Sequence, residues 1–163
     1  MDFGLDDKTA LVTGGAGRIG SEDCRILGEE GAEVVVLDVD EDGAKDVADE
    51  IEEDGGDAIA LECDLTDRDD VAAAVDDLQD ATGGVDVLVN NAGMVDAVGR
   101  TGDLDPSTWD RDMSINLTGT FNITREVFPN MCKRGWGRVI SMSSMAGAYG
   151  GFGQISYSTT KAG

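Results

Sequence analysis

Short apolar runs rich in β-branched residues alternate along this chain with longer segments of helical character, and this alternation restricts the fold more than any other feature. The apolar runs are continuous, as expected of strands that a parallel sheet buries on both faces. Strands and helices that take turns favour right-handed crossover connections. We therefore predict an α/β fold with a doubly wound parallel sheet. The expected strands cover residues 8–13, 33–38, 57–64, 85–91 and 137–144.

The segments between these strands carry the start and stop signals of helices. Gly31 is expected just after the first helix, and Thr66 is expected to cap the third. Asp105 is expected to cap the fourth helix, with Pro106 at its first position. No linker or repeat interrupts this pattern, so we expect residues 1–163 to form one domain. The expected helices cover residues 20–31, 42–54, 66–82 and 105–134, and a last helix begins near Tyr157.

Composition excludes several classes of function. The net charge of −22, from 34 acidic and 12 basic side chains, repels nucleic acid and anionic membranes, so we expect neither as a partner. The chain has no histidine and only three scattered cysteines, so we expect no metal site and no hydrolase triad. No apolar run is long enough to cross a bilayer and no secretory signal is visible, which predicts a cytoplasmic location.

The acidic residues are concentrated in the first part of the chain. Residues 1–89 carry 28 acidic and 5 basic side chains, whereas residues 90–163 carry 6 and 7. The acids are interleaved with regular apolar positions, which argues against an acidic disordered tail. Such a composition resembles that of proteins from salt-accumulating halophiles, whose acidic surfaces hold water and ions. We therefore expect a halophilic source.

A glycine-rich stretch, TGGAGRIG at residues 13–20, directly follows the first expected strand and opens the first helix. Glycines in this place let the backbone turn sharply and approach a pyrophosphate, and the N-terminus of the helix offers free N–H groups. The strand–turn–helix context predicts a dinucleotide site of the Rossmann type. The residues expected to bind the cofactor here are Gly14, Gly17, Arg18, Ile19 and Gly20.

Asp38 ends the second expected strand, 18 residues after Gly20. A carboxylate in this place hydrogen-bonds the ribose hydroxyls of adenosine and repels a 2′-phosphate. The alternative is a solvated aspartate at a strand end, since Asp40 and Glu41 follow directly. We predict NAD as the cofactor in preference to NADP, with Arg18 as the residue that could reach a 2′-phosphate.

Taken in order, the motifs resemble those of the short-chain dehydrogenase/reductase family along the whole chain. The glycine-rich stretch is followed by CDLTD (63–67), NNAG (90–93), NLTG (116–119), a pair of serines (143–144) and YSTTK (157–161). The resemblance implies that residues after the third strand hold the adenine and that residues after the fourth strand shape the floor of the cofactor site. These residues are Asp64, Leu65, Asn90, Asn91, Ala92 and Gly93.

The resemblance also implies a catalytic tetrad of Asn116, Ser144, Tyr157 and Lys161. Ser144 is preferred to Ser143 because it lies 13 residues before Tyr157, the spacing expected in the family. Oxidation of a secondary alcohol needs a base for the hydroxyl proton while hydride leaves the carbon. Lys161, one helical turn from Tyr157, favours the phenolate and borders the cofactor with it. Ser144 would hold the substrate oxygen, and Asn116 would support a water in a proton relay.

These motifs imply an NAD(P)-dependent oxidoreductase acting on an alcohol or ketone such as a sugar, a polyol or a 3-oxoacyl compound. One departure keeps a second enzyme class open. The glycines fall at Gly14, Gly17 and Gly20, with Arg18 where typical short members carry glycine. This spacing resembles the extended branch of the family, which includes sugar-nucleotide epimerases. A nucleotide-binding module without catalysis is a third possibility.

The family pattern continues beyond the last motif with a sixth strand, a substrate-covering loop and further elements. We therefore expect these residues to be an N-terminal fragment whose sheet is incomplete after the fifth strand. The strand over 137–144 would then be an exposed apolar edge. The resemblance implies a homo-oligomer, a dimer or tetramer, in which the 105–134 helix and the helix of Tyr157 pair with their copies. The near-neutral charge of residues 90–163 fits such burial.

Overall fold

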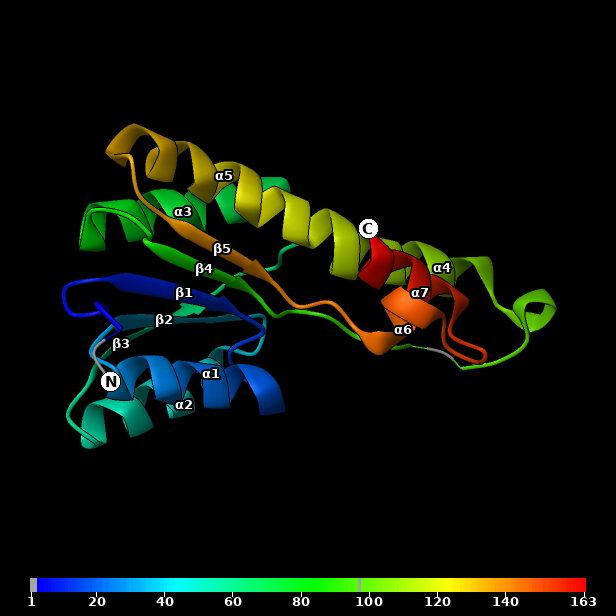
Figure 1. The fold of residues 1–163 in the computed structure, drawn as a ribbon, viewed down its shortest axis with the longest axis horizontal. Helices are drawn as coiled ribbons and strands as arrows, with labels where there is room; N and C mark the ends of the chain where they lie inside the picture. Colours follow the sequence, from blue (N-terminus) through cyan, green and yellow to red (C-terminus); the bar gives the residue numbers. More distant parts are fainter. Residues whose placement is uncertain (1–2, 97) are drawn as a thin grey trace.

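A parallel sheet of five strands in the order β3-β2-β1-β4-β5 forms the centre of the structure (Figure 1). This computed structural model describes residues 3–96 and 98–163. Every neighbouring pair of strands is parallel, which confirms the predicted doubly wound α/β fold. The strand order reverses between β1 and β4, where ligand-binding crevices open in sheets of this kind. The strands are β1 (Thr9–Thr13), β2 (Glu33–Asp38), β3 (Asp57–Glu62), β4 (Val87–Asn90) and β5 (Arg138–Ser141).

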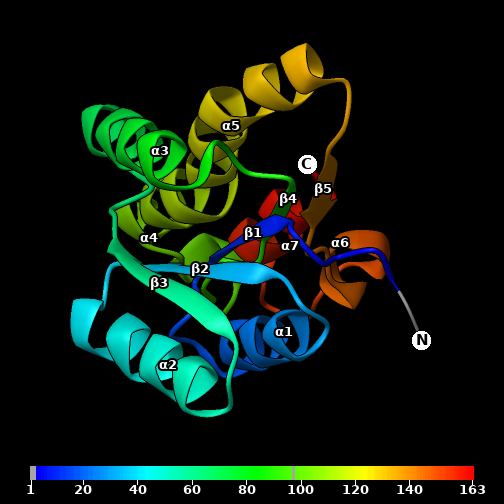
Figure 2. The ribbon, with the colours of Figure 1, turned by 90° about the vertical axis from the view of Figure 1, so that its left-hand side faces the viewer.

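Helices cover both faces of the sheet and give two separate cores (Figure 2). The helices α1 (Arg18–Glu29) and α2 (Glu41–Glu53) lie on one face, and α3 (Arg68–Thr82) and α5 (Thr120–Arg134) lie on the other. Side chains of β2 alternate between the two cores, because successive residues of a strand point to opposite faces. Val34 and Val36 join the first core, whereas Val35 and Leu37 join the second. This two-sided burial explains the continuous apolar runs of the sequence.

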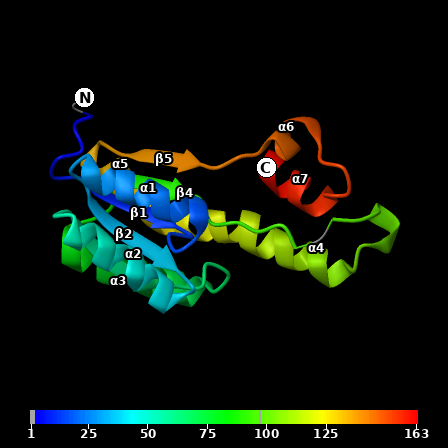
Figure 3. The same cartoon turned by 90° about the horizontal axis from the view of Figure 1, so that it is seen from below.

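The predicted helix over 105–134 is a long rod in three parts. The helix α4 (Pro106–Met113) passes into a π-helical segment, η2 (Ser114–Gly119), and then into α5. The Asp105 carboxylate accepts a hydrogen bond from Ser107 N at 2.8 Å, so the predicted cap and the first-turn proline are confirmed. Figure 3 shows the α4 end of the rod extending beyond the sheet. No helix among the described residues is long and apolar enough to cross a membrane.

Several local predictions need correction. Asp67, and not Thr66, caps α3, because the Asp67 carboxylate accepts from the N–H groups of Asp69 and Asp70 while the Thr66 hydroxyl donates to Asp64. The strands predicted to reach residues 64 and 144 end at 62 and 141 instead. The short helices η1 (Thr101–Asp103) and α6 (Met145–Tyr149) were not predicted, since neither contains a full apolar repeat. Gly31 follows α1 with a φ of +92°, as predicted.

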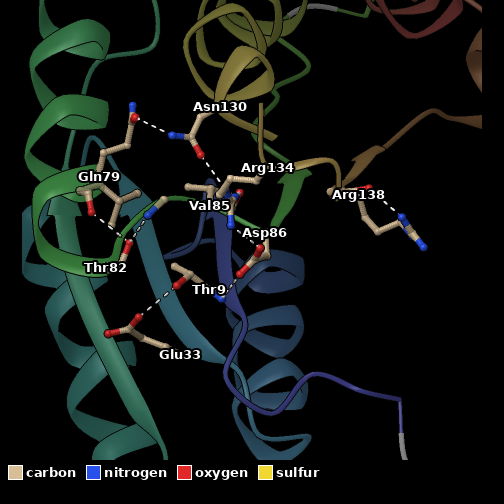
Figure 4. A network of polar contacts seen from close by, with 12 residues as sticks. Thr9, Glu33, Gln79, Thr82, Val85, Asp86, Asn130, Arg134 and Arg138 are labelled. Atoms are coloured by element: carbon tan, nitrogen blue, oxygen red, sulfur yellow. Dashed lines mark hydrogen bonds and ion pairs between the residues drawn. The ribbon is translucent and has the colours of Figure 1, made fainter. Parts of the chain in front are cut away.

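An ion pair between Asp86, just before β4, and Arg134, at the end of α5, lies beside the start of β1 (Figure 4). One carboxylate oxygen of Asp86 accepts from Arg134 Nη1 at 2.6 Å, and the other accepts from Thr9 N at 3.2 Å. The Arg134 guanidinium also donates to Val85 O and to Asn130 Oδ1. Asp86 is buried, and its carboxylate has the several partners that a buried charge requires, whereas the Arg134 side chain remains partly exposed. The pair therefore fixes the far end of the rod against the sheet.

The edge strand β5 is exposed along its whole length. Val139 and Ile140 are 38% and 49% exposed, in agreement with the predicted apolar edge. Just before β5, the Trp136 ring contacts both Lys8 Nζ and the Arg138 guanidinium, 5.0 and 4.8 Å from its centroid. These cation–π contacts tie the start of β5 to the segment before β1.

The three cysteines are predicted to differ in reactivity. Cys24 and Cys63 are buried, and burial raises the pKa of both thiols to about 12, whereas Cys132 is exposed. Because the thiolate is the reactive form, a disulfide reagent at neutral pH should modify one thiol rapidly in the folded protein. All three should react after unfolding in guanidinium. Rapid reaction of three thiols in the native state would contradict the packing of α1 and of the segment after β3.

Candidate active site

The glycine-rich loop between β1 and α1 is held against the end of β4 by close backbone packing. A Cβ atom on Gly14, whose φ is +66°, would lie 2.9 Å from Ala92 Cα, and one on Gly20 would lie 2.2 Å from Gly14 O. Asn91 Nδ2 donates to the carbonyl oxygens of Thr13 and Gly14 at 3.0 and 3.1 Å. Only glycine fits at these two positions. The loop therefore sits at the point where the strand order reverses.

The N-terminus of α1 is free of side-chain caps. Gly17 is the N-cap residue and offers no side chain, and the first turn contains no acidic residue. The first N–H groups of a helix lack partners within the helix, and its dipole favours an anion there. This end of α1 therefore fits the pyrophosphate of a dinucleotide.

A cleft opens above this loop at the carboxyl ends of the strands. It consists of two adjoining hollows of about 500 and 570 Å³, which share Gly14, Asp38, Val39, Ala92, Arg111 and Ile115 as walls. The first hollow adds Asp64 and Leu65, and the second adds Tyr157 and Lys161. The remaining predicted cofactor residues on its walls are Gly17, Arg18, Ile19, Asn91 and Gly93. Gly20 is buried beneath the loop, where it supports the loop's shape.

Asp38 stands at the rim of the cleft with its carboxylate held by two backbone groups. Its Oδ2 accepts from Ala16 N in the glycine-rich loop at 3.0 Å, and its Oδ1 accepts from Asp40 N at 3.1 Å. The first bond links the end of β2 to the loop. The carboxylate is thus fixed in the place where an adenosine ribose would lie in a Rossmann-type site.

Tyr157 and Lys161 lie one turn apart on α7 (Ile155–Ala162). Lys161 Nζ lies 6.0 Å from the centroid of the Tyr157 ring and donates to Met142 O at 2.9 Å. The Lys161 side chain is about half buried, and this desolvation lowers the pKa of its ammonium group. The structure therefore brings the predicted pair together on the wall that faces the glycine-rich loop.

Asn116 lies beside this pair, inside η2, and its side chain is fully engaged. Its Oδ1 accepts from Met94 N at 2.7 Å, and its Nδ2 donates to Met94 O at 2.8 Å. Its own carbonyl accepts from Thr120 Oγ1 at 3.0 Å within the π-helical turn. Asn116 thus fixes the segment after β4 against the rod, and it lines a smaller hollow with Lys161. π-Helical turns of this kind are frequent at functional sites.

The two neighbouring serines have different contacts from those expected. Ser143 is on the wall of the main cleft, and its hydroxyl donates to Lys161 O at 2.7 Å. The Ser144 hydroxyl accepts from Ala146 N and caps α6, and Ser144 is not among the described residues that line this cleft. The spacing to Tyr157 that favoured Ser144 measures sequence distance alone. The short unpredicted helix α6 engages the Ser144 hydroxyl as its cap, which sequence spacing could not reveal.

Two further residues of the site were not predicted from the sequence. The Thr13 hydroxyl accepts from the N–H groups of Asn91 and Ala92 at 3.1 and 3.0 Å and donates to Val89 O, so it joins the two halves of the cleft. Arg111 lines both hollows and pairs with Asp96 at 3.2 Å. The Thr13 position could have been found because it opens the glycine-rich stretch. Within the described part of the chain, no cluster of acidic, cysteine or histidine side chains is placed to hold a metal ion.

Comparison with known proteins decides the family. A model of the short chain dehydrogenase family matches residues 8–163. This chain belongs to that family. The match begins one residue before β1 and includes every element described above, so the short-chain dehydrogenase resemblance of the motifs is confirmed.

Individual relatives and solved structures agree with this short-chain dehydrogenase assignment. The chain is 38% identical over 161 residues to an acetoacetyl-CoA reductase of Cupriavidus necator, covering 98% of this chain and 65% of the relative. It is 35% identical over 160 residues to a 3-oxoacyl-[acyl-carrier-protein] reductase of Thermotoga maritima, covering 98% and 64%. An NAD⁺-bound xylitol dehydrogenase superposes with a TM-score of 0.94 at 32% identity, covering 97% of this chain and 61% of that chain. The chain thus spans less than two thirds of the length of each of these three proteins.

Alanine substitutions at two glycines of the loop should have unequal effects. The Cβ atom of Gly20→Ala would meet Gly14 O at 2.2 Å, whereas that of Gly17→Ala would lie 3.2 Å from the same atom. Overpacking predicts a loss of about 2 kcal/mol in the free energy of unfolding for Gly20→Ala. Gly17→Ala, a change at a helix N-cap, should cost less than about 1 kcal/mol. Urea unfolding followed by circular dichroism measures both, and equal losses would contradict the described loop.

Proposed function

We propose that this protein is an NAD(H)-dependent oxidoreductase that interconverts a secondary alcohol and a ketone. The observation that carries this proposal is the shared cleft, where Tyr157 and Lys161 face the glycine-rich loop and Asp38 across the carboxyl ends of the strands. A free helix N-terminus, a fixed rim carboxylate and a tyrosine–lysine pair fit a dinucleotide on one side and a hydroxyl group on the other. The names of the relatives, two reductases and a dehydrogenase, support the same reaction class.

In this proposal, one set of residues binds the dinucleotide and another transfers the proton. A bound nicotinamide supplies the acceptor or donor of hydride. The residues that would hold the dinucleotide are Gly14, Gly17, Arg18, Ile19, Asp38, Asp64, Leu65, Asn91, Ala92 and Gly93. Tyr157 Oη accepts the proton of the substrate hydroxyl in oxidation and returns it to the carbonyl oxygen in reduction. Lys161, about half buried, stabilises the phenolate of Tyr157 through its positive charge.

A serine hydroxyl next to Tyr157 would orient the substrate oxygen. Ser144 has the family spacing, whereas Ser143 stands on the cleft wall. Ser144→Ala and Ser143→Ala variants separate the two, because only the orienting hydroxyl should lower turnover strongly when it is removed. Asn116 would fix the segment after β4 and the turn of the rod beside Lys161.

The relatives suggest two substrate classes. A 3-oxoacyl thioester is suggested by the two reductases, and a polyol by the xylitol dehydrogenase. Acetoacetyl-CoA and xylitol are therefore the first probes to assay, in concentrated potassium chloride because of the proposed halophilic source. An epimerase, favoured by the spacing of Gly14, Gly17 and Gly20, would instead leave NAD(H) bound and unconsumed. A module without catalysis would bind NADH and turn over neither probe.

Tyr157→Phe tests the proposed chemistry. Loss of the acid–base hydroxyl should lower kcat by roughly a thousandfold. The affinity for NADH should change by less than about threefold, because the ring that borders the cleft is kept. Stopped-flow turnover and NADH fluorescence titration measure the two effects. Tyr149→Phe is the matched control, since Tyr149 is 81% exposed on α6, and full activity of Tyr157→Phe would refute the proposal.

Asp38→Ser tests the proposed preference for NAD over NADP. Removal of the carboxylate ends its repulsion of a 2′-phosphate and leaves Arg18 on the same cleft wall. We expect the ratio of NADPH to NADH affinity to rise about tenfold or more, since like charges placed together cost several kcal/mol. Glu41→Gln removes a nearby exposed charge. It is the control and should leave the ratio unchanged. An unchanged ratio in Asp38→Ser would contradict the assigned role.

We also propose a cytoplasmic homo-oligomer, a dimer or tetramer. Two aromatic side chains on α5 support contact between copies: Phe121 and Phe128 are 58% and 51% exposed. Light scattering on the protein expressed from its complete gene measures the mass. A monomer at micromolar concentration in concentrated salt would contradict this proposal.

A further inference from the structure

The carboxyl group of Asp112 is completely buried where the rod meets α7. It lies on α4, is 0% exposed, and its Oδ2 accepts a hydrogen bond from the hydroxyl of Ser156 on α7. Its Oδ1 has no hydrogen-bond partner among the described residues. Ser156 is 1% exposed and directly precedes Tyr157 in the chain. A buried acid therefore touches the first turn of the helix that carries the site.

A second buried contact repeats this arrangement one helical turn further along. Asn116 Nδ2 donates to Thr160 Oγ1 at 3.3 Å, and both residues are 4% exposed. Asp112 and Asn116 are four apart on the rod, and Ser156 and Thr160 are four apart on α7. Residues spaced by four share one face of a helix. The two contacts thus form a polar ladder between the rod and α7, with Asp112–Ser156 and Asn116–Thr160 as its rungs.

The ladder is in register with the site residues. Each rung residue on α7 precedes a site residue by one position: Ser156 comes before Tyr157, and Thr160 comes before Lys161. A step of one residue turns the helix by about 100°, so the ladder faces the rod while Tyr157 and Lys161 face the cleft. Thr160 Oγ1 also donates to Tyr157 O at 2.9 Å, which ties the second rung to the backbone of Tyr157.

Stability alone does not account for a carboxyl group at this place. A buried carboxyl with one unpaired oxygen costs free energy, and an apolar side chain of similar size is commonly as stable or more stable there. A carboxylate does, however, make a shorter and stronger hydrogen bond than a neutral acceptor. Buried polar contacts of this kind also permit only one register between two helices, which apolar packing does not enforce.

We propose that Asp112 is a positioning residue, which fixes the first turn of α7 through Ser156 and so places the Tyr157 hydroxyl relative to the cleft. This inference rests on the proposed function, since it gives Tyr157 its acid–base role. Asp112 acts on α7 through Ser156 and makes no contact with the reacting atoms. The second rung holds the turn of Lys161 in the same way. Loss of the first rung leaves the cofactor site intact and lets Tyr157 leave its reactive position.

The variants that test this proposal remove one rung and keep the other. Ser156→Ala deletes the donor with little change of shape, and Asp112→Val deletes the acceptor. Asp112→Asn keeps an acceptor oxygen for Ser156 and is the rescue variant. Thr159→Ala is the matched control on the same helix, because the Thr159 hydroxyl is exposed and donates only to Ile155 O within α7.

Two measurements on the protein expressed from its complete gene distinguish positioning from simple folding. Amide hydrogen exchange should rise about tenfold in the α7 peptide of Ser156→Ala and Asp112→Val, with α1 and α3 unchanged, since only the local opening of α7 is affected. With acetoacetyl-CoA or xylitol, kcat should fall about tenfold or more while KM and the Kd for NADH stay within about threefold. Asp112→Asn should restore kcat to within about threefold of the wild type.

The outcomes separate this inference from the proposed function. If Ser156→Ala and Asp112→Val match Thr159→Ala in both exchange and kcat while Tyr157→Phe is inactive, the ladder has no positioning role and the proposed function stands. A parallel rise of exchange in every element of Ser156→Ala would show a general loss of stability, which also overturns the inference. If Tyr157→Phe keeps full activity, the proposed function fails, and a selective rise of α7 exchange would then support the ladder as a structural contact alone.

Discussion

The bridge between the carboxyl ends of β1 and β4 is the contact on which the rest of the structure depends. The Thr13 hydroxyl accepts from the N–H groups of Asn91 and Ala92, and the Asn91 amide donates back to the loop carbonyls. These bonds join the strands at the point where the order of the sheet reverses. Because Gly14 and Gly20 carry no side chain, the loop can approach this bridge closely; a Cβ atom at either position would clash. The cleft exists because two segments about 78 residues apart in sequence are locked together here.

The second half of the site depends on the rod rather than on the sheet. Figures 1 and 3 show α4 and α7 beyond the strands, where the apolar cores of the sheet do not reach. Polar contacts made by Asp112 and Asn116 hold α7 there. Polar contacts are directional, so they fix a helix in one position, whereas apolar packing tolerates small shifts. This difference suits a site in which a misplacement of about 1 Å is expected to slow the reaction strongly.

Acidic residues are concentrated on the helices of the sheet, whereas the rod and α7 carry few of them. The acidic helices α2 and α3 carry solvated carboxylates that cap their own first turns, as Asp40 and Asp67 do. The rod and α7 carry few acids, and one of them, Asp112, is enclosed. Near the cleft the positive groups Arg18, Arg111 and Lys161 lie on the walls. An anionic dinucleotide would therefore meet cationic groups in a protein whose overall field repels it.

The sequence by itself determined the parallel sheet, the glycine-rich loop, the carboxylate of Asp38 and the start of the rod at Asp105, because each depends on local signals: apolar runs, backbone freedom and caps. The predictions that were wrong concern neighbouring residues that compete for one role, such as Asp67, which caps α3 in place of the predicted Thr66. Only the tertiary structure placed Ser143 on the cleft wall and engaged the Ser144 hydroxyl in the cap of α6. Only the tertiary structure shows that Asp112 is buried, because the sequence does not distinguish it from the many other acidic residues. Such decisions depend on contacts between segments tens of residues apart, and no local pattern encodes them.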